Sequence, residues 1–326
     1  MPELPEVQTT VDGLNSEVKN WTITDVWTIY NSAYHAGKDN IKNPKFFAQF
    51  KKKVIGAKIV GATRRAKNIL IHLSKADKNS SSRTADQDNQ TILIHMKMTG
   101  HIMAGVYTKD LKRSKTDPWR AVDTDPKNPL NDPFNKYLRF VLTISRGPKT
   151  KNLVLSDMRK FAKVTLLPTK GLEDSDELRH LGPEPLNPDF TYTIFETQLD
   201  KRKTTPIKQA LMDQTLIAGV GNIYSDEILW KAGVHPKSHF SKIPTAMRKK
   251  IFAATKEMLL KGIDFGGDSM SDYRNIHGLR GDFQNQHKAY RRTGKSCELR
   301  GCKGVIRRLV VGGRSGHFCD VHQTLF

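Results

Sequence analysis

The sequence predicts an α+β protein, with an N-terminal helix and a β-rich domain followed by a helical domain and a metal-binding hairpin. Three observations support this prediction: an apolar stripe of helical period at the start, short β-rich runs up to residue 168, and helical periods beyond it. A tail that holds every cysteine follows. We therefore expect domains at residues 1–168, 169–270 and 271–326.

The first helix is predicted by apolar residues that recur in alternating steps of three and four, as one stripe of an α-helix requires. These residues are Leu4, Val7, Val11, Leu14 and Val18. The helix therefore begins almost at the first residue.

Several short β-rich runs follow at a spacing that is typical of a sandwich or a barrel. They are Val54–Val60, Asn68–Leu73, Thr91–Met98, Leu138–Ser145, Asn152–Asp157 and Lys163–Leu167. Two polar tracts, 75–90 and 108–136, interrupt the series and are expected to be surface loops. We derive no function for either tract from the sequence.

After Pro168 the apolar residues change to helical periods. The expected helices are Glu173–Leu181, Phe190–Leu199, Pro206–Met212, Asn222–Ala232 and Thr245–Lys261.

The composition indicates a polyanionic partner. The 54 Lys and Arg outnumber the 33 Asp and Glu, which gives a net charge of +21 and a pI near 9.8. A mean hydropathy of −0.55 and the lack of a long apolar run argue against a membrane protein. Because the start of the chain lacks the features of a signal peptide, we expect a cytosolic location.

A metal site is indicated by Cys297, Cys302, Cys319 and His322, spaced as C-x4-C and C-x2-H. Two pairs of soft ligands a hairpin apart suit one tetrahedral structural zinc. The alternative is three incidental thiols and a histidine.

Pro2 is a candidate nucleophile, because removal of Met1 would leave its secondary amine as the N-terminus. Attack of such an amine on a sugar C1′ gives an iminium, which is a good electron sink for elimination. Glu3 adjoins it as a possible acid or base. The alternative is that Pro2 and Glu3 simply begin a helix.

A glycine-rich segment, 219–221, precedes Asn222 and the helix that follows. Backbone N–H groups at such a helix start can bind phosphate, although the same string also suits an ordinary turn. Basic residues flank the segment, namely Lys201, Arg202, Lys203 and Lys208. Because the net charge is +21, we expect these side chains to contact phosphate and not only solvent.

Seven segments, in collinear order along the whole chain, resemble the bacterial formamidopyrimidine-DNA glycosylases. They are Met1 to Val7, Arg65 to Asn68, His95 to Gly100, Asp157 to Phe161, Leu181 to Leu186, Leu211 to Tyr224 and Val311 to Cys319. This resemblance implies a β-sandwich domain, a helix-two-turn-helix around Gly219 and a β-hairpin zinc finger.

The resemblance also implies a base-excision repair enzyme that flips an oxidised purine, such as 8-oxoguanine or a formamidopyrimidine, out of duplex DNA. The enzyme would cleave the glycosidic bond and then nick the abasic site by β,δ-elimination. Damaged double-stranded DNA is the expected partner, the expected state is a monomer, and the expected place is the bacterial cytoplasm at the nucleoid.

Five residues match catalytic positions of that family. Pro2 matches the nucleophile, Glu3 the acid that helps to open the sugar, and Glu6 a supporting group. Lys67 matches the lysine that assists β-elimination, whereas without the resemblance it would be an ordinary edge lysine. Arg314 matches the arginine assigned to δ-elimination.

Seven further residues match DNA-contacting positions. His95, Lys203 and Asn222 match phosphate ligands, and Met98, Arg159 and Phe161 match the wedge that fills the gap left by the flipped base. Tyr137 stands where many members have a DNA-contacting histidine. Residues 268–283 match the loop that closes over the oxidised base.

Two alternatives remain at this point. An endonuclease VIII type enzyme for oxidised pyrimidines is disfavoured by Leu4, where that group has glycine, and by the 268–283 loop, which it lacks. A non-catalytic zinc-dependent DNA-binding protein would need none of Pro2, Glu3 and Lys67. The chain also departs from the usual family pattern in its C-x4-C spacing, its His322 ligand and its two long tracts.

Overall fold

The computed structural model describes residues 1–75, 89–110, 114, 118–270 and 272–326. This part of the chain forms two compact units. The N-terminal unit comprises Met1–Pro2, Glu6–Arg179 and Asp268–Gly281, and the C-terminal unit comprises Glu3–Pro5, His180–Gly267 and Asp282–Phe326. The three predicted domains stay a prediction, because the compact units do not follow chain order.

The first helix, α1 (Leu4–Glu17), buries the predicted stripe. Leu4, Val7, Val11, Leu14 and Val18 are each at most 3% exposed. This element is confirmed.

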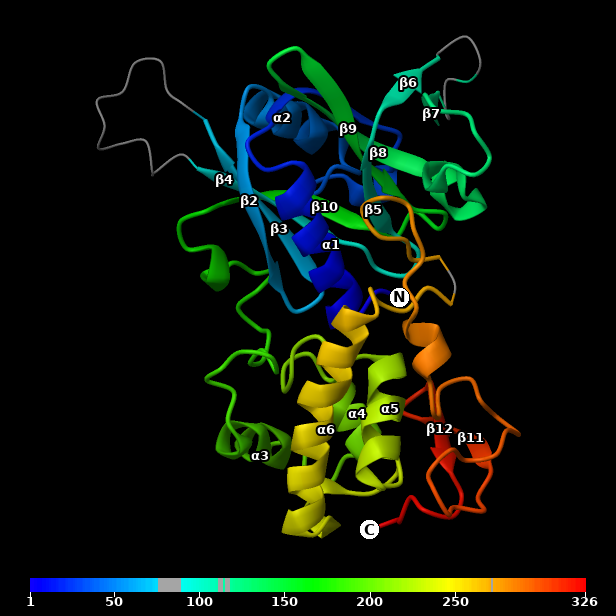
Figure 1. Cartoon of the computed structure of the whole chain (residues 1–326). Helices are drawn as coiled ribbons and strands as arrows, with labels where there is room; N and C mark the ends of the chain where they lie inside the picture. Colours follow the sequence, from blue (N-terminus) through cyan, green and yellow to red (C-terminus); the bar gives the residue numbers. More distant parts are fainter. Residues whose placement is uncertain (76–88, 111–113, 115–117, 271) are drawn as a thin grey trace. The chain divides into compact units, whose positions relative to one another are not determined.

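The N-terminal unit also contains α2 and most of the strands. Their bounds are β1 Thr22–Thr28, α2 Pro44–Val54, β2 Lys58–Arg65, β3 Asn68–Ser74, β4 Gln90–His95, β5 His101–Gly105, β6 Tyr107–Lys109, β7 Trp119–Ala121, β8 Leu138–Arg146, β9 Lys149–Ser156 and β10 Lys163–Pro168. Figure 1 shows these elements in the N-terminal unit.

Eight strands form an antiparallel sheet in the order β10-β4-β3-β2-β1-β8-β9-β5. The sheet is almost divided between β1 and β2, which share one registered pair, Thr22 with Lys58. Side chains from both halves enter one buried core together with α1, for example Ile71 from β3 and Leu142 from β8. Two half-sheets that face a shared core form a β-sandwich, as the sequence predicts.

The structure corrects three local predictions. The run Val54–Val60 is not one strand, since α2 ends at Val54 and β2 begins at Lys58. The sequence prediction omits β1 and α2, although α2 begins with an Asn43 cap and Pro44. The expected helix Glu173–Leu181 is only a 3₁₀ turn, Leu172–Asp174, because four acidic residues within five positions repel one another in a helix.

The tract 108–136 is not simply a surface loop where the structure describes it. The β6–β7 hairpin buries Tyr107 and Trp119 against Leu138 and Val154, on the outer face of β8 and β9. Two 3₁₀ turns, Pro129–Asn131 and Pro133–Lys136, follow it. Most of the tract 75–90 lies outside the described residues.

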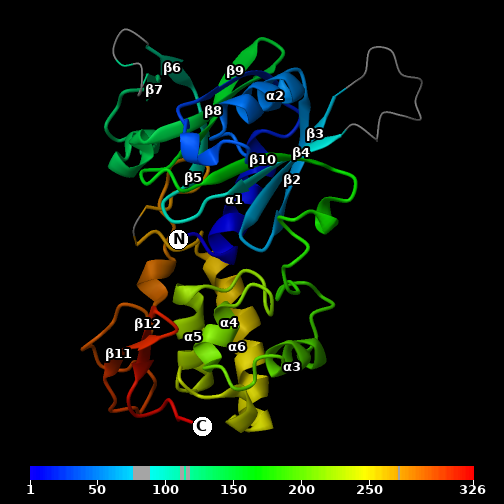
Figure 2. The same cartoon turned by 180° about the vertical axis from the view of Figure 1, so that it is seen from behind.

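The C-terminal unit contains the other four predicted helices and the hairpin. The bounds are α3 Tyr192–Asp200, α4 Ile207–Met212, α5 Asn222–Ala232, α6 Thr245–Asp264, β11 Ile306–Val311 and β12 Arg314–Cys319. Helix α5 contacts both α6 and β12, as Figure 2 also shows from behind. None of the helices in the described ranges combines the length and apolar character needed to cross a membrane.

Candidate functional site

In the C-terminal unit, the carboxylate of Glu3 is fixed at the start of α5. Its Oε1 accepts the backbone N–H of Ile223 at 2.9 Å and its Oε2 that of Tyr224 at 3.4 Å. The side chain is 2% exposed. The positive end of a helix stabilises a carboxylate in this position, so α5 both orients and binds Glu3.

The glycines before α5 make this contact possible. A Cβ on Gly221 would lie 2.4 Å from Cδ of Glu3, and Gly219, at φ +94°, would place a Cβ 2.6 Å from Cδ1 of Leu4. The backbone N–H of Leu4 also donates to the Gly219 carbonyl at 3.0 Å. Two backbone N–H groups at this helix start therefore bind Glu3.

Pro2 and Glu6 belong to the N-terminal unit. Pro2 is buried, and its nitrogen is an amide while Met1 precedes it. Glu6 is 1% exposed, and its Oε1 accepts the backbone N–H of Asp268 at 2.7 Å. Glu6 thus joins α1 to the first residue of the 268–283 loop.

Lys67 and His95 lie close together in the N-terminal unit. Lys67 occupies the two-residue turn between β2 and β3, where Arg65 pairs with Asn68, and Asn68 also pairs with His95. Burial, with the charges of Lys97 and Lys67, lowers the pKa of His95 to about 3. His95 is therefore neutral near pH 7, and its Nδ1 accepts the backbone N–H of Lys97 at 3.0 Å.

The three predicted wedge residues lie on two turns of the N-terminal unit. Met98 follows β4 and is 36% exposed, and Phe161 precedes β10 and is 48% exposed. The Arg159 guanidinium lies 4.5 Å from the centre of the Phe161 ring. Large apolar side chains held at the surface in this way are available to contact another molecule.

Asp157, which the site prediction does not include, joins these two turns. Its buried carboxylate accepts the Thr99 hydroxyl at 2.6 Å, the Tyr30 hydroxyl at 2.7 Å and the Ala162 N–H at 2.8 Å. Thr99 Oγ1 in turn accepts the Arg159 N–H at 3.1 Å. The hydrogen bonds therefore fix the backbone beside each wedge residue.

Tyr137 lies beside this network. Its carbonyl accepts the Asp157 N–H at 2.8 Å, and Lys136 Nζ lies 5.4 Å from the centre of its ring. The half-buried ring combines an apolar face with a nearby cation.

Two predicted DNA-contacting residues, Lys203 and Asn222, and the predicted catalytic residue Arg314 belong to the C-terminal unit. Lys203 is exposed on the turn after α3, and Asn222 is the first residue of α5. Arg314 begins β12 after a Gly312–Gly313 turn in which both glycines have positive φ, as a type I′ hairpin requires. Arg314 and Arg202 line a cavity of about 290 Å³ beside α4.

A buried network connects α4, α5 and β12, and it corrects the expected phosphate contact of Lys208, whose side chain has no exposed surface. Lys208 Nζ donates to Asp226 Oδ1 at 2.7 Å and to the Asn222 carbonyl at 3.2 Å. Asp226 Oδ2 accepts the His317 backbone N–H at 3.0 Å and lies 2.8 Å from His317 Nδ1. The network links the hairpin that carries Arg314 to the helix that begins at Asn222.

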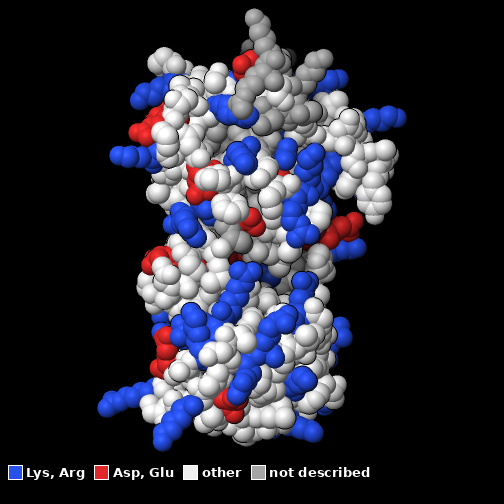
Figure 3. Space-filling view, turned by 90° about the vertical axis from the view of Figure 1, so that its right-hand side faces the viewer, with Lys and Arg blue, Asp and Glu red and all other residues white. Residues whose placement is uncertain are grey.

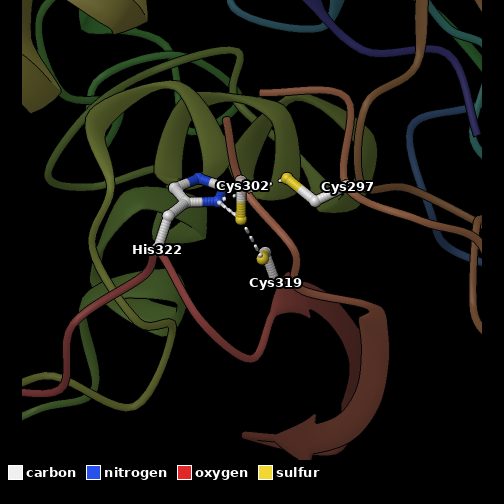
Figure 4. Close-up of side chains that lie close together, drawn as sticks. All are labelled: Cys297, Cys302, Cys319 and His322. Atoms are coloured by element: carbon white, nitrogen blue, oxygen red, sulfur yellow. Dashed lines mark hydrogen bonds between the residues drawn. The ribbon is translucent and has the colours of Figure 1, made fainter. Parts of the chain in front are cut away.

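The four predicted metal ligands gather in the C-terminal unit, with their ligand atoms within 4.8 Å of one another (Figure 4). The Sγ atoms of Cys302 and Cys319 are 3.6 Å apart, and His322 Nδ1 lies 3.3 Å from Cys297 Sγ. Tetrahedral zinc with Zn–S bonds of about 2.3 Å places two sulfurs about 3.8 Å apart. These residues therefore fit a zinc ion.

Neighbouring groups orient the ligands. His322 Nε2 lies 3.0 Å from the Trp230 carbonyl, so this nitrogen carries the proton and Nδ1 is free to bind a metal. The Gly304 N–H donates to Cys302 Sγ at 3.3 Å. A Cβ on Gly304 would lie 2.4 Å from Cys319 Sγ, so the ligand set requires glycine here.

Basic side chains are much more frequent than acidic ones on the face shown in Figure 3. On the hairpin, Arg307 and Arg308 of β11 and Arg314 of β12 are exposed. This distribution fits the net charge of +21 and favours contact with a polyanion.

Two family models match the chain. The formamidopyrimidine-DNA glycosylase N-terminal domain matches residues 1–164 and the H2TH domain of the same family matches residues 181–274. Curated proteins named formamidopyrimidine-DNA glycosylase match over almost the whole chain. That of Prochlorococcus marinus is 32% identical over 98% of both chains, and that of Chloroflexus aggregans is 32% identical over 100% of this chain and 99% of its own.

Solved structures show the same likeness. Lactococcus lactis Fpg in complex with DNA that contains an abasic site has a TM-score of 0.76 and 26% identity, over 99% of both chains. A complex of MutM with DNA that contains carbocyclic 8-oxo-G has a TM-score of 0.76 and 27% identity, over 99% of this chain and 100% of the other.

Proposed function

The chain belongs to the formamidopyrimidine-DNA glycosylase family, and we propose that it excises oxidised purines from duplex DNA and then cleaves the strand at the abasic site. The observation that carries this proposal is the buried carboxylate of Glu3, bound by two N–H groups of α5 immediately after Pro2. A protein that only binds DNA has no need of a fixed carboxylate next to a potential amine nucleophile.

Pro2 supplies the nucleophile once Met1 is removed. Its nitrogen attacks C1′ of the damaged nucleotide and loses its proton to the Glu3 carboxylate, the glycosidic bond breaks, and the base departs with the bonding electrons and takes a proton from water. Glu3 donates a proton to the sugar ring oxygen, which opens the ring and leaves a cationic iminium between Pro2 and C1′.

Elimination then follows from the iminium. Loss of a proton from C2′ expels the 3′ phosphate, and Lys67 in the β2–β3 turn assists this β-elimination. A second, δ-elimination expels the 5′ phosphate, with Arg314 as the residue that holds it. Hydrolysis of the iminium releases the sugar fragment, so the product is a one-nucleotide gap with phosphate on both sides.

The remaining site residues hold the opened duplex. Met98, Arg159 and Phe161 fill the space left by the flipped base, and Arg159 pairs with the cytosine opposite. His95, Lys203 and Asn222 contact phosphates, and Tyr137 contacts the DNA beside the wedge. The neutral imidazole of His95 acts as a hydrogen-bond partner and not as a cation.

Cys297, Cys302, Cys319 and His322 hold one structural zinc. When bound, this ion stabilises the hairpin on which Arg314 lies. Four protein ligands would leave no position on the ion for water or substrate, so the zinc would have a structural role. We further propose that the enzyme acts as a monomer in the bacterial cytoplasm, at the nucleoid.

One substrate panel tests the function. Purified protein is incubated with duplexes that carry 8-oxoguanine opposite cytosine, thymine glycol or an abasic site, and strand cleavage is measured on a gel. We expect cleavage at 8-oxoguanine and at the abasic site. A preference for thymine glycol would support an endonuclease VIII type enzyme, and binding without any cleavage would support a non-catalytic protein.

A further inference from the structure

Residues 272–281, here called the closing segment, contain neither helix nor strand. Three of their side chains are nevertheless buried in the N-terminal unit, with Tyr273 at 4%, Arg274 at 1% and Ile276 at 2% exposure. Segments without regular structure normally expose their side chains to solvent. This segment is therefore anchored by specific contacts.

The first set of contacts is made with α1 and β5. The Tyr273 hydroxyl donates to the Glu6 carbonyl at 3.0 Å, and the Ala104 N–H donates to the Ile276 carbonyl at 2.8 Å. Ile276 packs so closely on α1 that a Cβ on Gly13 would lie 2.5 Å from its Cγ2. These contacts bind one side of the closing segment.

The second set is made with residues 129–135, which lie in the long tract 108–136. The Arg274 guanidinium binds the Asp132 carboxylate with two nitrogens, Nε at 3.0 Å and Nη2 at 2.9 Å from Oδ2. Nη2 also lies 3.1 Å from Oδ1. The guanidinium lies 4.9 Å from the centre of the Phe134 ring, so the charge is held between a carboxylate and an aromatic face.

A hydrogen-bonded chain adds to this ion pair. Asn135 Nδ2 donates to the Pro129 carbonyl at 2.7 Å and to the Gly278 carbonyl at 3.3 Å. Its Oδ1 therefore accepts from Nε2 of the buried His101, 2.8 Å away. Gly278 has φ +79°, and a Cβ there would lie 2.9 Å from both Asn135 Nδ2 and the Pro129 carbonyl oxygen.

We propose that residues 129–135 form a dock that holds the closing segment in place before DNA binds, with the Asp132–Arg274 ion pair as its main contact. This inference rests on the proposed function, in which the loop beginning at Asp268 closes over the oxidised base. A segment that is already ordered loses less conformational entropy when it closes on a base. The dock therefore favours excision of the base and has no effect on a substrate that lacks one.

Asp132→Asn is the variant that tests the dock. It removes the charge but keeps the Oδ1 that accepts the Phe134 N–H at the start of the 3₁₀ turn. Asp25→Asn is the matched control, because it removes the carboxylate of the half-exposed Lys51–Asp25 pair in the same unit. Circular dichroism confirms that each variant is folded.

Two measurements are made on both variants and on the unaltered protein. The first is hydrogen exchange of the amides of 272–281 without DNA. The second is the ratio of kcat/KM for 8-oxoguanine excision to kcat/KM for cleavage of a preformed abasic site. For Asp132→Asn we expect exchange to become faster and the ratio to fall, each by about ten-fold or more, as loss of a charge-assisted hydrogen bond implies. Asp25→Asn should change neither.

Exchange that stays unchanged in Asp132→Asn would overturn the dock, as would an equal fall of both activities. Arg274→Lys provides a second test, since it keeps the positive charge but loses the bidentate contact with Asp132. It should change both measurements in the same direction as Asp132→Asn does. If the unaltered protein cleaves none of the duplexes, the proposed function fails, whereas hydrogen exchange still decides whether the dock exists.

Discussion

Lys208 Nζ lies 2.7 Å from Asp226 Oδ1, and neither side chain has any exposed surface. The ammonium also donates to Ser225 Oγ at 2.9 Å, while the other Asp226 oxygen binds His317. A charge removed from water in this way is stable only while its partners remain. The ion pair therefore couples α4, α5 and the hairpin that carries Arg314.

Asp226→Asn should lower the free energy of unfolding by about 3 to 5 kcal/mol, because it leaves the Lys208 ammonium buried without an anion. Urea denaturation measures the change. Glu257→Gln is the control, since the Lys231–Glu257 pair is about half exposed and its loss should cost about 1 kcal/mol or less. Equal losses in the two variants would contradict the prediction.

Zinc should be present at one ion per chain in natively purified protein. His322→Ala should reduce zinc retention, because Nδ1 of His322 is one of the four gathered ligand atoms. His180→Ala, which removes an exposed histidine of the same unit, should leave the zinc content unchanged. Elemental analysis measures both variants, and metal-free native protein would refute the site.

Removal of the zinc with a chelator should free the β11–β12 hairpin and weaken DNA binding through Arg314. We expect faster hydrogen exchange in residues 306–319 and unchanged exchange in the strands of the N-terminal unit. Uniform loss of protection in both units would indicate instead that the metal stabilises the whole fold.

The stability of the protein should fall as the pH decreases from about 6.5 to 4. Burial lowers the pKa of His101 to about 4, whereas an unfolded histidine titrates near 6.5. The unfolded chain therefore binds a proton first, and about 3 kcal/mol of stability present above pH 6.5 is lost by pH 4.

His101→Gln should flatten this pH dependence, as measured by urea denaturation at several pH values, although His95 will preserve some slope. The exposed His180, changed to Gln, provides the comparison. An unchanged slope in His101→Gln would show that His101 is not the group responsible.

The sequence predicted the elements whose signal is local. The apolar stripe on α1, the helix Asn222–Ala232 and the four metal ligands each follow a fixed spacing within a short stretch. The structure contains both helices and gathers the four ligand atoms. The role of Pro2, indicated by its position after Met1 and by the resemblance, stays a prediction, as do the roles of Lys67 and the wedge residues, which came from the resemblance alone.

The sequence could not predict contacts between distant residues. Asp157 binds Thr99, 58 positions away, and Tyr30, 127 positions away, and no periodicity connects these three. The same holds for Arg274 and Asp132, which are 142 positions apart. Burial of a charge depends on tertiary packing, so an Asp or Arg in the sequence carries no signal that it will be buried.

The covalent mechanism requires the Pro2 nitrogen to be a free amine that bonds to the DNA. Borohydride added during turnover should reduce the iminium and leave protein attached to the DNA through the Pro2 nitrogen. Pro2→Gly should retain some attachment through its primary amine, whereas an additional residue before Pro2 should abolish it. Gel electrophoresis of the crosslinked species measures this, and absence of an adduct between an abasic duplex and protein that lacks Met1 would remove the covalent step.

Glu3→Gln separates the two halves of the reaction. The amide keeps one oxygen for the Ile223 N–H, whose contact with Glu3 is 2.9 Å, so the start of α5 should remain ordered, but it cannot donate the proton of a carboxylic acid. Removal of 8-oxoguanine should fall by about 10²-fold or more, the usual contribution of a general acid. Cleavage of a preformed abasic site should fall much less, because no glycosidic bond remains and the sugar is already partly open. An equal loss of both activities would place Glu3 in the elimination instead of in base removal.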